Sequence, residues 1–190
     1  LTSAVLIDDG YISKIKKHLG NDKVHIKAST QTLAINLSKK KDLRCEDLYI
    51  YTAPPFQSNS PSPDEIKRKQ GYDKNLQKLL SVKIPTTWVR EGRLQKINNG
   101  FKQKGVDPWI VFDMLLIAQR KNHDVIILVT ADTDFAKIIK EIRKTYNIPI
   151  FVAGYIERER KSKFSMSNEL WESCDEVIQI TKNDFFLNNN

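Results

Sequence analysis

The sequence has few of the residues that hold small proteins together covalently or through a bound metal. Among its 190 residues are two cysteines, Cys45 and Cys174, which form no CxxC pair. This spacing excludes a zinc ribbon and a redox dithiol, and we expect two reduced thiols rather than one long-range disulfide. Glycine and proline, at 7 residues each, are too sparse for a fibrous or a disordered chain.

Long hydrophobic runs are also absent. No apolar stretch approaches the roughly 20 residues that a membrane-spanning helix needs, so we expect no membrane association. The opening LTSAVLIDDG has a short apolar part and no basic flank, unlike a signal peptide. Together with reduced thiols, this predicts a cytoplasmic protein.

Several common site motifs are missing as well. The sequence has no GxxxxGK[ST], GxGxxG or GxSxG, which argues against an NTP-binding, a dinucleotide-binding or an α/β-hydrolase domain. Its three histidines, His18, His25 and His123, show no ligand spacing, and we expect them on the surface.

Acidic residues are the minority charge. The chain has 31 Lys and Arg against 23 Asp and Glu, which gives a net charge of +8 and a pI near 9.4. A basic surface attracts polyanions such as nucleic acids, although many lysine-rich proteins bind none. The position of the few carboxylates is therefore more informative than the total charge.

Strand and helix patterns alternate along the chain. Short apolar runs predict strands at residues 4–7, 48–51, 125–129, 148–153 and 176–180. Helical spacing and capping residues predict helices at 11–19, from Ser29–Thr30 onward, and at 65–80, 107–119, 135–146 and 168–173. Residues 82–89 and 94–97 indicate a strand pair or an extended excursion, and the GFKQKG stretch at 100–105 a basic loop.

This alternation, with strands that are apolar throughout, is typical of a parallel sheet covered on both faces. We therefore predict one three-layer α/β/α domain with a central, mainly parallel sheet over residues 1–185. Residues 186–190 are expected to form a disordered tail.

Carboxylates follow two of the best strands. Asp8 and Asp9 end the first strand, and Asp132 and Asp134 follow the strand at 125–129. Ligands of open α/β sheets bind outside the carboxyl ends of strands, so these acids share one crevice if the two strands are neighbours.

Such a cluster favours a metal ion. Two carboxylates about 5 Å apart repel by roughly 3 kcal/mol at an effective dielectric of 20, so clustered acids hold protons or recruit a cation. Hard oxygen ligands prefer Mg²⁺ or Mn²⁺ to zinc. On a basic protein, this chemistry suits phosphodiester hydrolysis by metal-activated water.

Each acid also has a structural interpretation. Asp8 and Asp9 precede Gly10 as in an ordinary turn, Asp132 or Thr133 could cap the helix that starts near Phe135, and Asp107 is a strong N-cap candidate. Asp113 lies in the apolar segment WIVFDMLLIA, where an unpaired charge is costly. It needs a cation, a proton or a partner, and we favour a functional role over a buried salt bridge.

Four segments resemble a known family in order and over most of the chain: VLIDDGYI, FKQKGVDPWIVFDMLLIA, VIILVTADTDFAKII and SCDEVIQI. They are similar to the NYN domain, in particular its LabA-like branch. The loop APPFQ and the segment EIKRKQGYDKNLQKLL also resemble that branch. The resemblance implies a PIN-like Rossmannoid fold and Mg²⁺- or Mn²⁺-dependent cleavage of RNA.

The resemblance also assigns roles by position. Asp8 matches the first-strand acid, Asp107 the acid of KGVD, and Asp132 and Asp134 the acids of the DxDF pattern. Asp113 matches the second acid of the KGVD helix. Thr130 stands where a Ser or Thr usually precedes the acids and could orient a metal-bound water.

We therefore hypothesise a metal-dependent ribonuclease acting on single-stranded RNA. Its catalytic and metal-binding residues would be Asp8, Asp107, Asp132 and Asp134, with Asp113 supporting the metal site. Substrate contacts would come from Asp9, Thr130, Lys102, Lys104, Arg158 and Arg160, and from the basic run at residues 67–69.

Two other classes remain open. An RNA-binding regulatory module could keep the fold and the basic surface with little or no turnover. A phosphotransfer or phosphatase domain has a similar layout, but the haloacid-dehalogenase nucleophile pattern would need an acid where Gly10 stands. The sequence leaves the natural RNA and the oligomeric state open, with a homodimer as one option.

Overall fold

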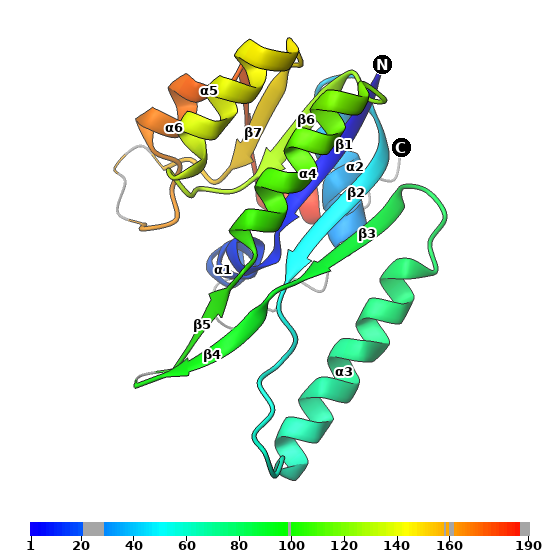
Figure 1. Ribbon diagram of the computed structural model, residues 1–190, viewed down its shortest axis with the longest axis vertical. Helices are drawn as coiled ribbons and strands as arrows, with labels where there is room; N and C mark the ends of the chain where they lie inside the picture. Colours follow the sequence, from blue (N-terminus) through cyan, green and yellow to red (C-terminus); the bar gives the residue numbers. More distant parts are fainter. Residues whose placement is uncertain (21–28, 99, 158, 160–161, 187–190) are drawn as a thin grey trace.

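The structure, a computed structural model, describes residues 1–20, 29–98, 100–157, 159 and 162–186. Its centre is a six-stranded parallel sheet in the order β3-β2-β1-β6-β7-β8 (Figure 1). The strands are β1 (Thr2–Asp8), β2 (Arg44–Thr52), β3 (Thr86–Glu91), β6 (Val125–Val129), β7 (Ile150–Gly154) and β8 (Glu176–Gln179). The His25, Arg158 and Arg160 predictions and most of the predicted tail lie outside the described residues.

The strand order reverses between β1 and β6. The chain builds outward from β1 to β2 and β3, then returns to place β6 on the other side of β1. The two strands pair in register, Ile7 opposite Val129, so their carboxyl ends lie side by side. This is the position at which open α/β sheets bind ligands.

Helices cover both faces of the sheet (Figure 1). One face carries α1 (Asp9–Leu19), α2 (Thr30–Lys39) and the 3-10 helix η1 (Lys182–Phe185); the other carries α4 (Asp107–Arg120), α5 (Phe135–Tyr146) and α6 (Asn168–Ser173). Side chains of β1 alternate between the two cores, with Val5 and Ile7 in one and Ala4 and Leu6 in the other. The expected three-layer α/β fold is confirmed.

Two elements extend past the carboxyl edge of the sheet (Figure 1). One is α3 (Pro63–Leu80), an 18-residue helix with no buried residue, which a Ser62–Glu65 capping box begins. The other is an antiparallel hairpin of β4 (Arg93–Ile97) and β5 (Gly100–Lys104). The edge between β1 and β6 thus lies at the base of these two projections.

The hairpin corrects our prediction of a basic loop at residues 100–105. Its β5 strand is polar and largely exposed, so no alternation of apolar residues marks it in the sequence. Backbone pairing with β4, rather than burial, forms this strand. Gly100 begins it and Gly105 follows it, at positive φ angles of 139° and 78°.

The surface prediction for His123 was also wrong. His123 is 7% exposed, and its Nε2 atom lies 2.9 Å from Asp47 Oδ2. The hydrogen bond with the Asp47 carboxylate offsets the cost of burying a polar ring, and burial lowers the pKa of His123. Exposure of His18 was predicted correctly.

Both cysteines are free thiols, as expected. No helix within the described residues is long and apolar enough to cross a membrane.

Candidate active site

Asp8 is the last residue of β1 and the N-cap of α1. Its Oδ1 atom accepts hydrogen bonds from the backbone N–H groups of Gly10 at 3.0 Å and Tyr11 at 3.3 Å. The pKa of Asp8 is nevertheless raised to about 6, mainly by burial and to a smaller extent by the nearby charge of Asp107. Neither hydrogen bond uses Oδ2, so one oxygen of an incompletely solvated carboxyl group remains available for a cation.

Asp107 comes from a different element, the start of α4. The N-cap of this helix is Val106, and no side chain caps it, so the predicted capping role of Asp107 was wrong. The Asp107 residue is exposed. Its pKa is raised by partial desolvation and by the charges of Asp132 and Asp134, while Lys102 lowers it.

Asp132 and Asp134 follow β6, which lies next to β1. The Asp132 N–H donates to Thr130 Oγ1 at 3.1 Å, and Asp132 Oδ1 accepts from the Asp134 N–H at 3.0 Å. Both carboxylates are exposed, whereas Thr130 is fully buried. The Thr130 hydroxyl therefore holds the backbone of Asp132 in place rather than reaching a substrate.

Four acids from three parts of the chain thus lie at the carboxyl edge, where the charge of Asp107 interacts with those of the other three. Among the described residues, no three His, Cys, Asp or Glu side chains are grouped closely enough to chelate an ion directly. Mg²⁺ keeps several of its waters and needs only one or two protein carboxylates, so the all-oxygen donor set suits such an ion. A cation at this edge would favour the ionised forms of Asp8 and Asp107, whose pKa values are both raised by burial and by neighbouring carboxylates.

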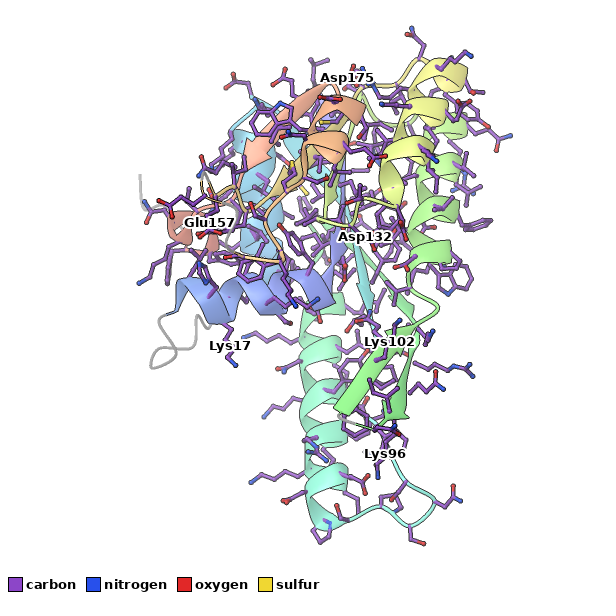
Figure 2. All side chains as sticks on the ribbon, turned by 90° about the vertical axis from the view of Figure 1, so that its left-hand side faces the viewer. Lys17, Lys96, Lys102, Asp132, Glu157 and Asp175 are labelled. Atoms are coloured by element: carbon purple, nitrogen blue, oxygen red, sulfur yellow. The ribbon has the colours of Figure 1, made fainter. Side chains whose placement is uncertain are left out.

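The β4–β5 hairpin lies next to the acids and contacts the turn that follows β1. Figure 2 shows Lys102 on the hairpin beneath Asp132, at the junction of body and projection. Gln103 from the same strand lies over Gly10, where its Oε1 would be 2.7 Å from an added Cβ, and its buried Nε2 has no hydrogen-bond partner. Sequence analysis missed Gln103, because a residue in a polar hairpin carries no signal of contact with a distant turn.

Other predicted site residues lie at different distances from this edge. Asp9 begins α1 and accepts a hydrogen bond from Thr52 Oγ1 at 3.1 Å. Lys104 is exposed at the end of β5. The basic run Lys67, Arg68 and Lys69 lies in the first half of α3.

Asp113 has a buried salt bridge, the alternative that we had considered less favourable. Its side chain is 2% exposed and receives Arg90 Nη2 at 2.9 Å and Arg90 Nε at 3.0 Å. Tyr51 OH donates a third hydrogen bond at 3.0 Å. Both carboxylate oxygens are thereby used, so Asp113 links α4 to β2 and β3 and we do not retain it as a metal ligand.

These features define a class of protein: an α/β domain with a Rossmann-like parallel sheet and carboxylates gathered where its strand order reverses. The NYN domain model matches residues 48–181, which is more than half of the chain. The chain belongs to the NYN domain family, part of the PIN-like nuclease superfamily.

Solved structures support the fold. A protein of unknown function from Vibrio parahaemolyticus has 18% sequence identity, with 98% of this chain and 96% of that chain covered and a TM-score of 0.61. A Group IV chitinase from Ostrinia furnacalis, at 16% identity and a TM-score of 0.33, covers 94% of this chain and 51% of its own. The second likeness is too weak to use. No curated protein matches the sequence.

Proposed function

We propose that this protein is a metal-dependent ribonuclease that hydrolyses phosphodiester bonds of single-stranded RNA at the carboxyl edge of β1 and β6. The observation that carries the proposal is the position of Asp107, whose charge acts on Asp8 and which itself feels the charges of Asp132 and Asp134, so that acids from three elements reach one edge. Membership of a PIN-like nuclease superfamily supports the same reaction class.

Asp8, Asp107 and Asp132 would hold Mg²⁺ or Mn²⁺, directly or through water, and Asp134 would complete the negative field. When bound, the ion would activate a water molecule and neutralise charge on the phosphate. The chain's own part is to position these carboxylates. Asp8 is fixed by its cap to α1, and Asp132 is fixed by Thr130.

The hairpin suits a role in holding the RNA backbone. Its residues 93–104 include four basic side chains and no acidic one: Arg93, Lys96, Lys102 and Lys104. Lys102 is close enough to Asp107 to lower that residue's pKa, so a phosphate bound by Lys102 would lie near the acids. In our proposal, Arg158 and Arg160 approach the same strand of RNA. A place in the LabA-like branch and a cytoplasmic location with reduced thiols are further parts of this proposal.

Charge-neutral variants test the site. Asp8→Asn, Asp107→Asn and Asp132→Asn should each lower the cleavage of single-stranded RNA by roughly 100-fold or more, in line with the loss of a metal-ion contribution of several kcal/mol. Asp42→Asn is the matched control, because it removes the same charge from an exposed turn before β2, at a positive φ of 54° that Asn also adopts. Folded variants that cleave as the wild type does would overturn the proposed site.

A further inference from the structure

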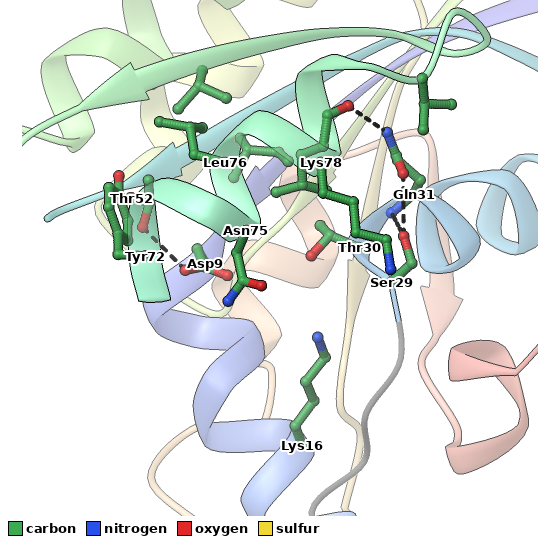
Figure 3. Close-up of a pocket in the computed structure, with 14 residues that line it drawn as sticks. Asp9, Lys16, Ser29, Thr30, Gln31, Thr52, Tyr72, Asn75, Leu76 and Lys78 are labelled. Atoms are coloured by element: carbon green, nitrogen blue, oxygen red, sulfur yellow. Dashed lines mark hydrogen bonds between the residues drawn. The ribbon is translucent and has the colours of Figure 1, made fainter. Parts of the chain in front are cut away.

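A cavity of about 630 Å³ lies beside the acidic edge, on the face of the sheet that carries α1 and α2 (Figure 3). Its walls come from α3, the start of α2, the middle of α1 and the ends of β2 and β3. The volume is in the range of about 300–1,000 Å³ typical of small-molecule sites. The proposed function makes no use of this cavity.

One wall of the cavity is apolar. Ile50 and Val89 are direct partners in the β2–β3 register, and Leu76 and Leu79 face them from α3. Aliphatic walls of this kind cover the flat faces of bases and other planar groups without selecting one hydrogen-bonding pattern.

The opposite wall presents a polar group without a partner. Thr30 is 8% exposed, and its hydroxyl makes no hydrogen bond with any part of the chain that the structure describes. In Figure 3 the Thr30 side chain points into the cavity, as does the Asn75 amide from α3. The Thr30 hydroxyl is not among the sealed polar atoms that lack a partner in the described chain, so it is open to the cavity, where water or a ligand oxygen can bond to it.

The cavity is also positively charged on two sides. Lys16 from α1 and Lys78 from α3 line it, and both ammonium groups reach toward the first residues of α2 in Figure 3. The start of α2 adds the positive end of a helix dipole, next to the Ser29 hydroxyl that accepts from the Gln31 N–H at 3.2 Å. Two lysines, a helix start and a hydroxyl together fit the oxygens of a phosphate group.

The cavity lies directly beside the acidic edge, because consecutive residues of the chain belong to the two sites. Asp8 belongs to the acid cluster, whereas its neighbour Asp9 lines the cavity and accepts a hydrogen bond from Thr52, also in the lining. A nucleotide in the cavity would therefore be held next to the proposed reaction site.

We propose that this cavity binds one nucleoside phosphate unit, with its phosphate between Lys16, Lys78 and the start of α2 and its base against the Ile50–Val89 wall. The assignment of this unit to the RNA strand being cleaved rests on the proposed function. A base can enter such a cavity only when it is unpaired and unstacked, so the occupant would be single-stranded.

The test measures binding without cleavage, in the Asp132→Asn background and in metal-free buffer. The probes are a short fluorescent single-stranded RNA and adenosine monophosphate. Lys78→Glu should weaken RNA binding by about 10-fold or more, since it reverses a charge at a phosphate contact. Thr30→Val, which keeps the shape of the side chain and removes its hydroxyl, should weaken binding by roughly 3- to 10-fold.

Lys74→Glu is the matched control, because it makes the same charge change on the same helix at an exposed residue that does not line the cavity. We expect an effect below about 3-fold for this variant, and thermal unfolding shows whether each variant is folded. Equal effects of Lys74→Glu and Lys78→Glu, or no effect of Lys78→Glu and Thr30→Val on either probe, would overturn the proposal.

The two probes distinguish the source of the nucleoside phosphate. If Lys78→Glu and Thr30→Val weaken RNA binding, the unit belongs to the RNA strand. If both variants weaken only adenosine monophosphate binding, the cavity takes a free nucleotide. That result would support a nucleoside phosphate site and overturn its assignment to the RNA strand being cleaved. Binding that depends on Lys78 without any cleavage by the wild type would support the cavity while the proposed ribonuclease function fails.

Discussion

Asp8 is both a helix cap and a proposed metal ligand, and its surroundings have opposite effects on the ionised form of its carboxyl group. Two backbone N–H groups stabilise the charge, whereas burial and Asp107 oppose it more strongly, so the pKa is raised to about 6 from 3.8. An acid with a raised folded-state pKa favours the fold when protonated. Its contribution is complete below the unfolded-state pKa and is lost as the pH rises through the folded-state pKa.

The first prediction concerns this pH dependence. Between pH 4 and 6 the wild type should lose up to about 3 kcal/mol of unfolding free energy through Asp8. Asp8→Asn, which keeps a side chain suited to the N-cap, should remove most of this loss and be more stable than the wild type at pH 7.5. Urea unfolding at several pH values measures the difference. A wild type and variant with parallel pH profiles would contradict the assigned electrostatics.

The second prediction concerns the Asp113–Arg90 pair, whose two partners are unequally buried. Arg90→Met leaves a carboxylate that is 2% exposed with Tyr51 alone, and should cost roughly 3–5 kcal/mol. Asp113→Asn should cost less, about 1–3 kcal/mol, because the Arg90 side chain is 33% exposed and reaches water. Chemical denaturation of both variants measures the order, and a reversed order would contradict the account.

At the scale of elements, the β4–β5 hairpin is anchored by close backbone contact. A Cβ at Gly92 would lie 2.4 Å from the carbonyl oxygen of Lys104 and 2.8 Å from Val106 Cγ2, and the Gly92 N–H donates to Thr52 O at 2.8 Å. The residue after Val106 is Asp107, so the base of the hairpin also sets where α4 begins.

The third prediction follows from this contact. Gly92→Ala should destabilise the protein by about 1–3 kcal/mol, because the backbone around Lys104 has to shift. RNA cleavage should fall in proportion to the fraction of protein that is no longer folded. Gly71→Ala is the control: it has no atom within 4 Å of the added Cβ and lies inside α3. It should be neutral or stabilise the helix by up to about 1 kcal/mol. Thermal unfolding and cleavage assays compare the pair, and equal behaviour would contradict the role of Gly92.

The fourth prediction concerns the charge on the hairpin. If Lys102 contacts a phosphate, Lys102→Gln should weaken RNA binding and reduce the slope of log K against log salt by roughly 0.7, the value for one contact to a single strand. Lys140→Gln is the control, since Lys140 lies beside residues 147–149 at the opposite edge of the sheet. An unchanged slope for Lys102→Gln, or an equal change for Lys140→Gln, would remove the hairpin from the RNA path.

The same scale shows what the sequence can predict. The strand Val125–Val129 is a continuous apolar run, and the helix Phe135–Tyr146 has apolar residues at helical spacing. Local sequence reveals both patterns, and both elements were predicted correctly. The β5 strand was missed because it pairs without burial. His123 was misplaced because its partner Asp47 is remote in the chain.

For the candidate site, the sequence predicted that Asp8 and Asp132 share one crevice if their strands are neighbours, and β1 and β6 do pair in parallel. It did not reveal that Asp113 is already paired, since Arg90 lies on β3 and nothing local connects the two residues. Gln103 was missed for the same reason. The cavity beside Asp9 was also missed, because it forms only when α1, α2 and α3 meet.

At the scale of the whole molecule, four carboxylates lie at one edge of a protein whose net charge is +8. Basic projections extend from that edge, and a cavity with two lysines adjoins it. This distribution would draw a polyanion toward the acids and leave the acids themselves to a cation.

The fifth prediction concerns the cation. Mn²⁺ should raise the melting temperature of the wild type, because an ion that binds only the folded state stabilises it. The increase should be larger at pH 7.5 than at pH 5, since the ion requires Asp8 in its ionised form. In Asp8→Asn the increase should be much smaller. Equal shifts at both pH values would contradict a site that contains Asp8.

The central claim is tested most directly by cleavage of a labelled single-stranded RNA in the presence of Mg²⁺ or Mn²⁺, with EDTA and the Asp132→Asn variant as controls. We predict cleavage by the wild type with metal and none in either control. Tight, salt-sensitive RNA binding without product under any metal would contradict a ribonuclease and favour an RNA-binding module.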